Sequence, residues 1–249
     1  MTGPDRNLVL TRAAAALILA SIGAACSGAD RPGSAEETGG TVVIATTSDP
    51  ASLFPPTAIN MESRQATELI YEYLADVGTG MNTVSDTGFV KEIASGWRWS
   101  EDSSALAFTL NPQARWHDGK PVTAHDVAFS FSIYTDTTIS ASTLSSLRDI
   151  DSVSVIDSST AKFWFKRRNP RLFYEAASQM LILPSHILES VPRDSLKLFT
   201  ASHPPIGSGK YQLASWNKGS SFELRALASH YRGRAGPERV IWNITPEYQ

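Results

Sequence analysis

The pattern of apolar and polar positions along the chain predicts two β-hairpins. Apolar and polar residues alternate through 89–99 and again through 105–110, with an acidic turn at 101–104 between them. Residues 153–156 and 161–165 repeat this arrangement. Alternation is typical of strands that bury one face. Further strands are predicted at 41–46, where a continuous β-branched run indicates a buried strand, and at 211–216, 222–226 and 240–244.

The same pattern predicts a helix over residues 62–75. Five apolar residues there recur at the spacing of one helix face: Ala66, Leu69, Ile70, Tyr73 and Leu74. Glu68 and Glu72 are four residues apart on this helix, and we interpret them as a solvated face rather than an acid–base pair. Residues 78–87 are predicted to form a loop, and another helix begins near Pro170.

Residues 114–131 combine a strand end, a tight turn and the start of a helix. Asp118 and Gly119 supply the turn, because glycine tolerates the positive φ that a tight reversal needs. Thr123 and Asp126 predict a capping box, in which each residue bonds a backbone N–H of the other. An apolar helix face follows. These residues indicate a scaffold and not a catalytic group.

Ten residues of this stretch form a longer motif: Trp116, His117, Asp118, Gly119, Pro121, Val122, Thr123, Ala124, Asp126 and Val127. In these residues the stretch resembles the signature of the family 5 extracellular solute-binding proteins, the peptide- and nickel-binding receptors of ABC importers. His125 stands where that family usually has an acidic residue. Three other segments resemble family elements in the right order: 69–74, 181–188 and 205–213.

The resemblance implies an α/β fold, a class II clamp of the kind found in periplasmic binding proteins. Residues 41–57 and 185–249 would form an incomplete first lobe, and 58–184 an inserted small α+β lobe. Family members are considerably longer, so we expect the second large lobe to be absent from this chain. Structural roles in the signature region are expected for Trp116, Asp118, Gly119, Pro121, Thr123 and Asp126.

The resemblance also implies a function. The chain would capture a peptide or similar small solute as a monomer and present it to ABC permease subunits. Ile59, Asn60 and Met61 are the candidate ligand-binding residues, with an ordinary connecting loop as the alternative. Two other hypotheses stay open: a truncated fragment that binds no peptide tightly, and an exported hydrolase.

Composition and the N-terminus add a location. The chain has 249 residues and a net charge of −3, which gives no basic footprint for nucleic acid. Arg6 and Arg12 precede a short apolar run that ends at Cys26, the only cysteine. This resembles a bacterial lipoprotein signal at 1–26, with Cys26 lipidated, and 27–40 then reads as a flexible polar tether. The expected location is the periplasm or the outer face of the cell membrane. Simple secretion is the alternative.

Candidate chemistry is sparse. The densest cluster of histidine and aspartate is His117, Asp118, His125 and Asp126, and turn and cap roles already explain both carboxylates. Glycine-flanked serine of the hydrolase type does not occur in the sequence. We therefore expect no catalytic residue, no metal and no cofactor.

Overall fold

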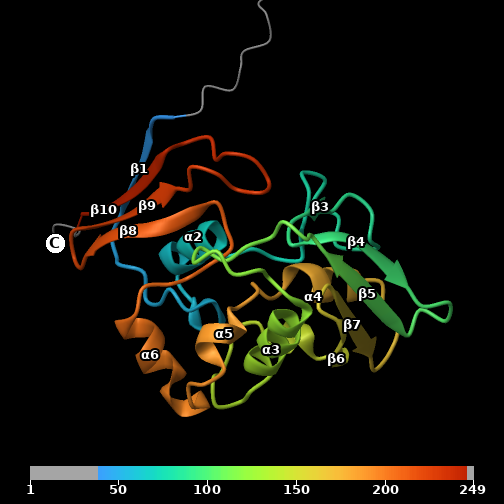
Figure 1. The fold of residues 1–249 in the computed structure, drawn as a ribbon. Helices are drawn as coiled ribbons and strands as arrows, with labels where there is room; N and C mark the ends of the chain where they lie inside the picture. Colours follow the sequence, from blue (N-terminus) through green and yellow to red (C-terminus); the bar gives the residue numbers. More distant parts are fainter. Residues whose placement is uncertain (1–38, 246–249) are drawn as a thin grey trace, which may run out of the picture. The chain divides into compact units, whose positions relative to one another are not determined.

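The computed structural model describes residues 39–245, in which two four-stranded sheets are the largest elements (Figure 1). The first sheet has the order β1-β10-β9-β8. β1 pairs parallel with β10, whereas the other neighbours are antiparallel. Its strands are β1 (Thr41–Thr46), β8 (Tyr211–Asn217), β9 (Ser221–Ala226) and β10 (Arg239–Ile244). All four predicted strands are confirmed.

The expectation that residues 41–46 are buried is wrong. β1 is an edge strand with β10 as its neighbour, and Val42 and Val43 are 41% and 57% exposed. A run of β-branched residues favours a strand, but it does not determine how many neighbouring elements cover that strand. The buried apolar side chains of this sheet lie mainly on β9 and β10, with Tyr211 on β8. The rings of Phe222 and Trp242 stack with centroids 4.2 Å apart.

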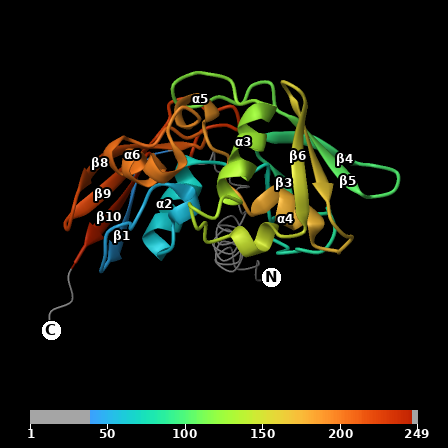
Figure 2. The same cartoon turned by 90° about the horizontal axis from the view of Figure 1, so that it is seen from below.

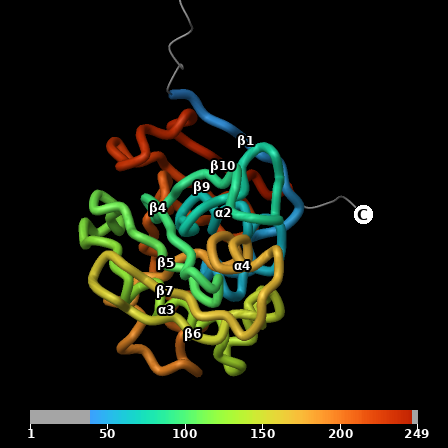
Figure 3. The backbone as a smooth tube through the Cα atoms, turned by 90° about the vertical axis from the view of Figure 1, so that its right-hand side faces the viewer, coloured from blue at the N-terminus to red at the C-terminus, as the bar shows by residue number. Residues whose placement is uncertain are grey.

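The second sheet has the order β4-β5-β7-β6, and all its pairs are antiparallel. Both predicted hairpins are confirmed. Figure 2 shows helix α3 (Ala124–Tyr134) against β6, and Figure 3 shows α4 (Leu172–Ser178) beside the same sheet. The strands are β4 (Ala94–Trp99), β5 (Ala105–Leu110), β6 (Ile150–Asp157) and β7 (Thr160–Phe165).

Short elements connect the two sheets. A two-stranded ribbon pairs β2 (Ala75–Asp76) with β3 (Val90–Lys91). The predicted loop at 78–87 lies between these strands. The remaining elements are η1 (Pro55–Thr57), η2 (Leu144–Leu147), α5 (Ser185–Leu188), η3 (Arg193–Ser195) and α6 (Leu196–Ser202).

The predicted helix over 62–75 is helix α2 (Met61–Ile70), which ends five residues early. The chain continues extended from Tyr71, and the N–H of Leu74 bonds the carbonyl of Ala177. Tyr73 and Leu74, which follow the helix, are therefore covered by neighbouring segments and do not lie on a helix face. Helix α2 contacts β8, so it packs against the first sheet, whereas the predicted lobe boundary at residue 58 puts it in the small lobe. That boundary stays a prediction.

Within residues 39–245, the helices are too short and too polar to cross a membrane.

Candidate functional site

The predicted ligand segment lies at the start of α2. Asn60 is the N-cap residue of this helix, and its Oδ1 accepts from the N–H groups of Ser63 and Ala51, both at 3.2 Å. Its Nδ2 donates to the carbonyl of Asp49 at 2.9 Å. The side chain of Asn60 is therefore engaged within the protein, and its observed role is to hold the 49–60 loop against α2.

Ile59 and Met61, on either side of Asn60, point their apolar surface to solvent. Their exposed fractions are 68% and 69%. Large apolar side chains with this exposure, on a backbone held by a cap, are suited to contact a bound molecule.

The loop before this segment is fixed from a second direction. The carboxylate of Asp49 accepts from the indole Nε1 of Trp216 at 2.8 Å and from the N–H of Gly219 at 2.7 Å. On the other side, the Thr46 hydroxyl donates to Glu62, which lowers the pKa of that carboxyl. The loop is thus tied to β1, to α2 and to the β8–β9 turn.

Two cavities border the segment. One of about 630 Å³ includes Ile59, Leu53 and Trp216 in its wall. The other, of about 510 Å³, begins at Ala58 and has a polar wall made of three tyrosines and three carboxylates: Tyr73, Tyr134, Tyr174, Glu68, Asp76 and Glu92. Burial raises the pKa of Glu68, and the nearby charge of Asp76 adds to this effect.

The signature turn forms as predicted. Gly119 has φ +86°, and its N–H donates to the carbonyl of Trp116 at 2.8 Å, closing the turn. Pro121 forms a bridge to Arg115 across it. Asp118 bonds the Nε2 of His186 at 2.7 Å. Burial alone would raise the pKa of Asp118, but hydrogen bonds from His186 and Lys120 lower it below its usual value.

Asp126 connects two helix starts. Thr123 and Asp126 form the predicted capping box, with the Thr123 N–H donating to Asp126 Oδ2 at 2.8 Å. The other oxygen, Oδ1, accepts from the N–H and the hydroxyl of Ser185 at 2.9 and 2.6 Å. Asp126 is buried, so one carboxylate fixes both the start of α3 and the start of α5.

His117 links the signature turn to the Gly207–Ser208–Gly209 segment, which we name the glycine crossing. Its Nδ1 accepts from the N–H of Gly207 at 3.2 Å, and its Nε2 faces the carbonyl of Gly209 at 2.9 Å. The crossing passes directly over the end of α2: a Cβ on Gly207 would lie 1.8 Å from the carbonyl oxygen of Ile70. Glycine is therefore required there for close approach.

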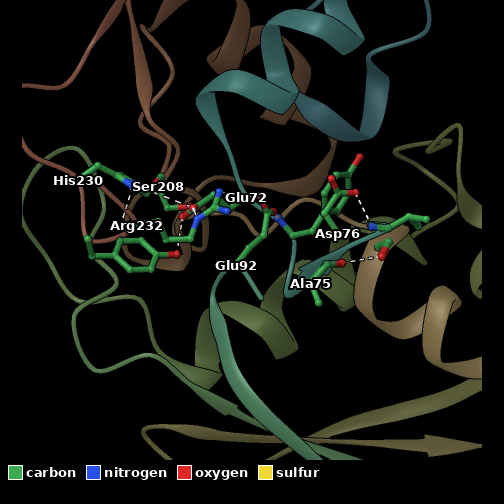
Figure 4. Close-up of polar contacts among 11 residues, drawn as sticks. Glu72, Ala75, Asp76, Glu92, Ser208, His230 and Arg232 are labelled. Carbon is green, nitrogen blue, oxygen red and sulfur yellow. Dashed lines mark hydrogen bonds and ion pairs between the residues drawn. The ribbon is translucent and has the colours of Figure 1, made fainter. Parts of the chain in front are cut away.

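The interpretation of Glu72 as part of a solvated helix face is wrong. Glu72 lies beyond the end of α2, is 1% exposed and bonds Arg232 Nε at 2.6 Å and the Tyr231 hydroxyl at 2.8 Å (Figure 4). Arg232 reaches on to Glu92, Nη2 to Oε1 2.7 Å. Burial raises the pKa of Glu92 to about 7.

Sequence reasoning missed this cluster because its members are far apart in the chain. The bond between Glu72 and Arg232 spans 160 positions, and neither residue sits in a motif with metal or catalytic spacing. The structure also separates the candidate residues into two groups: Ile59, Asn60 and Met61 lie at the start of α2, whereas the signature residues lie around the start of α3. Cys26 is outside the described residues. Within 39–245, acidic residues and histidines do not gather in a group able to hold a metal ion.

Comparison with known proteins gives consistent matches. The oligopeptide-binding protein AppA of Bacillus subtilis is 24% identical over 251 aligned positions, which cover 97% of this chain and 45% of AppA. The structure of AppA in complex with a nonapeptide superposes with a TM-score of 0.76 at 23% identity, covering 85% of this chain and 41% of that one. The chain thus spans less than half the length of this relative.

A second solved structure, NikZ of Campylobacter jejuni in complex with Ni(L-His), has a TM-score of 0.67 at 25% identity, covering 82% of this chain and 39% of that one. The fold is therefore that of the class II periplasmic binding proteins, of which the chain covers a part. The family model described as "Bacterial extracellular solute-binding proteins, family 5 Middle" matches residues 88–249, more than half of the sequence, and the chain belongs to this family.

Proposed function

We propose that the chain is an extracytoplasmic solute-binding protein that captures peptides, or a similar small solute, for an ABC transporter. Membership of a solute-binding family supports this proposal and argues against an enzyme. The relative AppA is named an oligopeptide-binding protein, and NikZ was solved with a nickel–histidine complex. Proteins of this fold therefore hold ligands of more than one chemical class, and a peptide is our first candidate.

The observation that carries the proposal is the segment Ile59–Asn60–Met61. Two exposed apolar side chains flank a residue whose amide is bonded within the protein. A backbone that is held before the ligand arrives loses little conformational freedom on binding, which favours affinity. We assign Ile59 and Met61 the apolar contacts and the backbone of Asn60 a place beside the extended ligand.

The experiment is a titration of the isotopically labelled full chain, followed by amide NMR, with an equimolar mixture of synthetic di-, tetra- and nonapeptides. We expect saturable shifts of the amides of 58–62. Ile59→Asp should weaken binding about tenfold or more, equivalent to about 1.4 kcal/mol. The matched control is Leu198→Asp, since Leu198 is 76% exposed on α6. No shift at millimolar peptide, or equal loss in both variants, would contradict the proposal.

We further propose that Cys26 carries a lipid, that the folded part is a monomer outside the cytoplasm, and that its partners are the ABC permease subunits. In a bacterial host, Cys26→Ala should move the protein from the membrane fraction to the soluble fraction, whereas Ser27→Ala should not. Equal distribution of the two variants would favour simple secretion.

A further inference from the structure

The glycine crossing is held by two half-buried histidines that come from different loops. His117 lies in the turn between β5 and α3, and His230 lies in the loop between β9 and β10. His117 bonds Gly207 and Gly209, and the Nε2 of His230 faces the carbonyl of Ser208 at 2.8 Å. Each residue of the crossing is thus bonded by one of the two rings.

The bonding partners fix the protonation state of both rings. Nδ1 of His117 faces the N–H of Gly207, and Nδ1 of His230 faces the N–H of Arg232, at 3.2 Å in each case. A backbone N–H can only donate, so each Nδ1 must be without a proton. The two Nε2 atoms face carbonyl oxygens and must donate. In both histidines, these are the contacts that a ring with its proton on Nε2 and none on Nδ1 makes.

The crossing in turn holds the end of α2. The N–H of Gly209 donates to the carbonyl of Ile70 at 2.8 Å, and this carbonyl belongs to the last residue of the helix. We propose that His117 and His230 are positioning residues which hold the glycine crossing against the end of α2 near neutral pH and release it in acid. An added proton on Nδ1 of His117 would face the N–H of Gly207 and break a bond to the crossing. An added proton on Nδ1 of His230 would face the N–H of Arg232 and break the bond that orients this ring toward Ser208.

The charged groups around the two rings affect how strongly a fall in pH favours release of the glycine crossing. His117 faces His230 and Glu72, with Asp118 on its own turn, and burial lowers the pKa of His117. His230 has Glu72 Oε1 at 3.6 Å and the ring of Tyr231 at 4.5 Å. The two oxygens of Glu72 are already bonded by Arg232 and by Tyr231.

Glu92 acts in the opposite direction. It bonds Arg232, and it gains a proton over the same pH range because burial raises its pKa to about 7. Protonation of Glu92 therefore stabilises the closed arrangement as the pH falls. A test must compare variants with the wild type, since Glu92 is present in both and its effect cancels.

The proposal has a consequence at the other end of α2, where Asn60 caps the helix between Ile59 and Met61. Release of the crossing would loosen the helix that presents the candidate ligand segment. This consequence rests on the proposed function. The histidine pair itself does not, because its test needs no ligand.

The test is amide hydrogen exchange of the full chain, read at Gly207 and Gly209, at pH 7.5 and 5.5 and corrected for the intrinsic exchange rate. An imidazole in water has a pKa near 6.5. A ring that stays neutral while the crossing is closed, and takes up a proton freely once it is open, raises the equilibrium constant for opening about tenfold from pH 7.5 to pH 5.5. His117→Gln and His230→Gln keep a neutral donor and acceptor but cannot titrate. The pH-dependent factor is the ratio of the opening constant at pH 5.5 to that at pH 7.5. Each single variant should lower this factor about tenfold relative to the wild type, and the double variant about a hundredfold.

The control is His203→Gln, because His203 is exposed at the end of α6 and should leave the factor unchanged. Nitrogen NMR of the imidazoles in the wild type gives a second measurement, which does not depend on whether a variant folds. We expect both rings to be neutral with the proton on Nε2 at pH 7.5. A charged ring at pH 7.5, protonation without loss of protection at Gly207 and Gly209, or variants with the wild-type factor would each overturn the proposal.

Discussion

Single residues in the glycine crossing leave no room for a side chain. We expect Gly207→Ala to lower the free energy of unfolding by about 3 kcal/mol or more, because its Cβ would meet the Ile70 carbonyl at 1.8 Å and neither backbone can move freely. Gly236→Ala is the control: nothing lies within 4 Å of its added Cβ, so we expect a change below about 1 kcal/mol. Urea unfolding of the two variants measures both values, and similar losses would show that the crossing is not tight.

The carboxyl of Glu92 gives a pH dependence that comparison of a Glu92 variant with the wild type separates from that of the two histidines. Its pKa is about 7 in the folded protein, above the usual 4.5, so the folded state binds more protons than the unfolded state between these values. The resulting stabilisation is complete below pH 4.5 and is lost as the pH rises through 7. Between pH 5 and 8 the loss is about 2 to 3 kcal/mol.

Glu92→Gln should remove this slope. From pH 5 to pH 8, the free energy of unfolding measured in urea should therefore fall by about 2 to 3 kcal/mol less in the variant than in the wild type. Glu101→Gln, at an exposed turn between β4 and β5, should keep the wild-type decrease. Identical slopes for Glu92→Gln and the wild type would mean that Glu92 stays ionised in the folded protein.

Among the elements, helices α3 and α5 are joined through the buried carboxylate of Asp126. Asp126→Ala leaves the N–H groups of Thr123 and Ser185 without their acceptor, and we expect a loss of about 3 kcal/mol. Ser185→Ala removes only the hydroxyl contact, and about 1 kcal/mol is expected. The double variant should lose about 1 kcal/mol less than the sum, since the two residues share a bond. Asp151→Ala on the exposed part of β6 serves as the control.

The elements also show which features the sequence could predict. Alternation identified both hairpins, and the Thr123–Asp126 spacing identified the cap, because these signals depend on near neighbours. Helix α2 ends at Ile70, and the carbonyl of this last residue accepts from the N–H of Gly209, far along the chain. The burial of Glu72 depends on Arg232 in the same way. Long-range partners of this kind leave no periodic trace around either residue.

The same limit applies to the candidate site. The segment at 59–61 was chosen from a family resemblance, and the structure adds that Asn60 is a cap while Ile59 and Met61 are exposed. The position of a segment after a strand can be read from the sequence. The sequence does not show which of its side chains turn inward, because that depends on the bonds that Asn60 makes with Ser63, Ala51 and Asp49.

At the scale of the whole molecule, strand β1 stands at the end of the first sheet's strand order. Within residues 39–245 its neighbour is β10, and the apolar side chains of Val42 and Val43 are exposed beside the free edge. An apolar edge strand favours pairing between copies, and a lysine placed on it opposes such pairing.

We expect the chain to be monomeric when dilute and to self-associate as its concentration rises. Val43→Lys should raise the concentration at which self-association begins, the onset, at least about tenfold. Val90→Lys, on the short strand β3, should leave the onset unchanged. Light scattering over a concentration series distinguishes these outcomes. An onset shared by all three proteins would place the self-association at a surface other than the edge of β1.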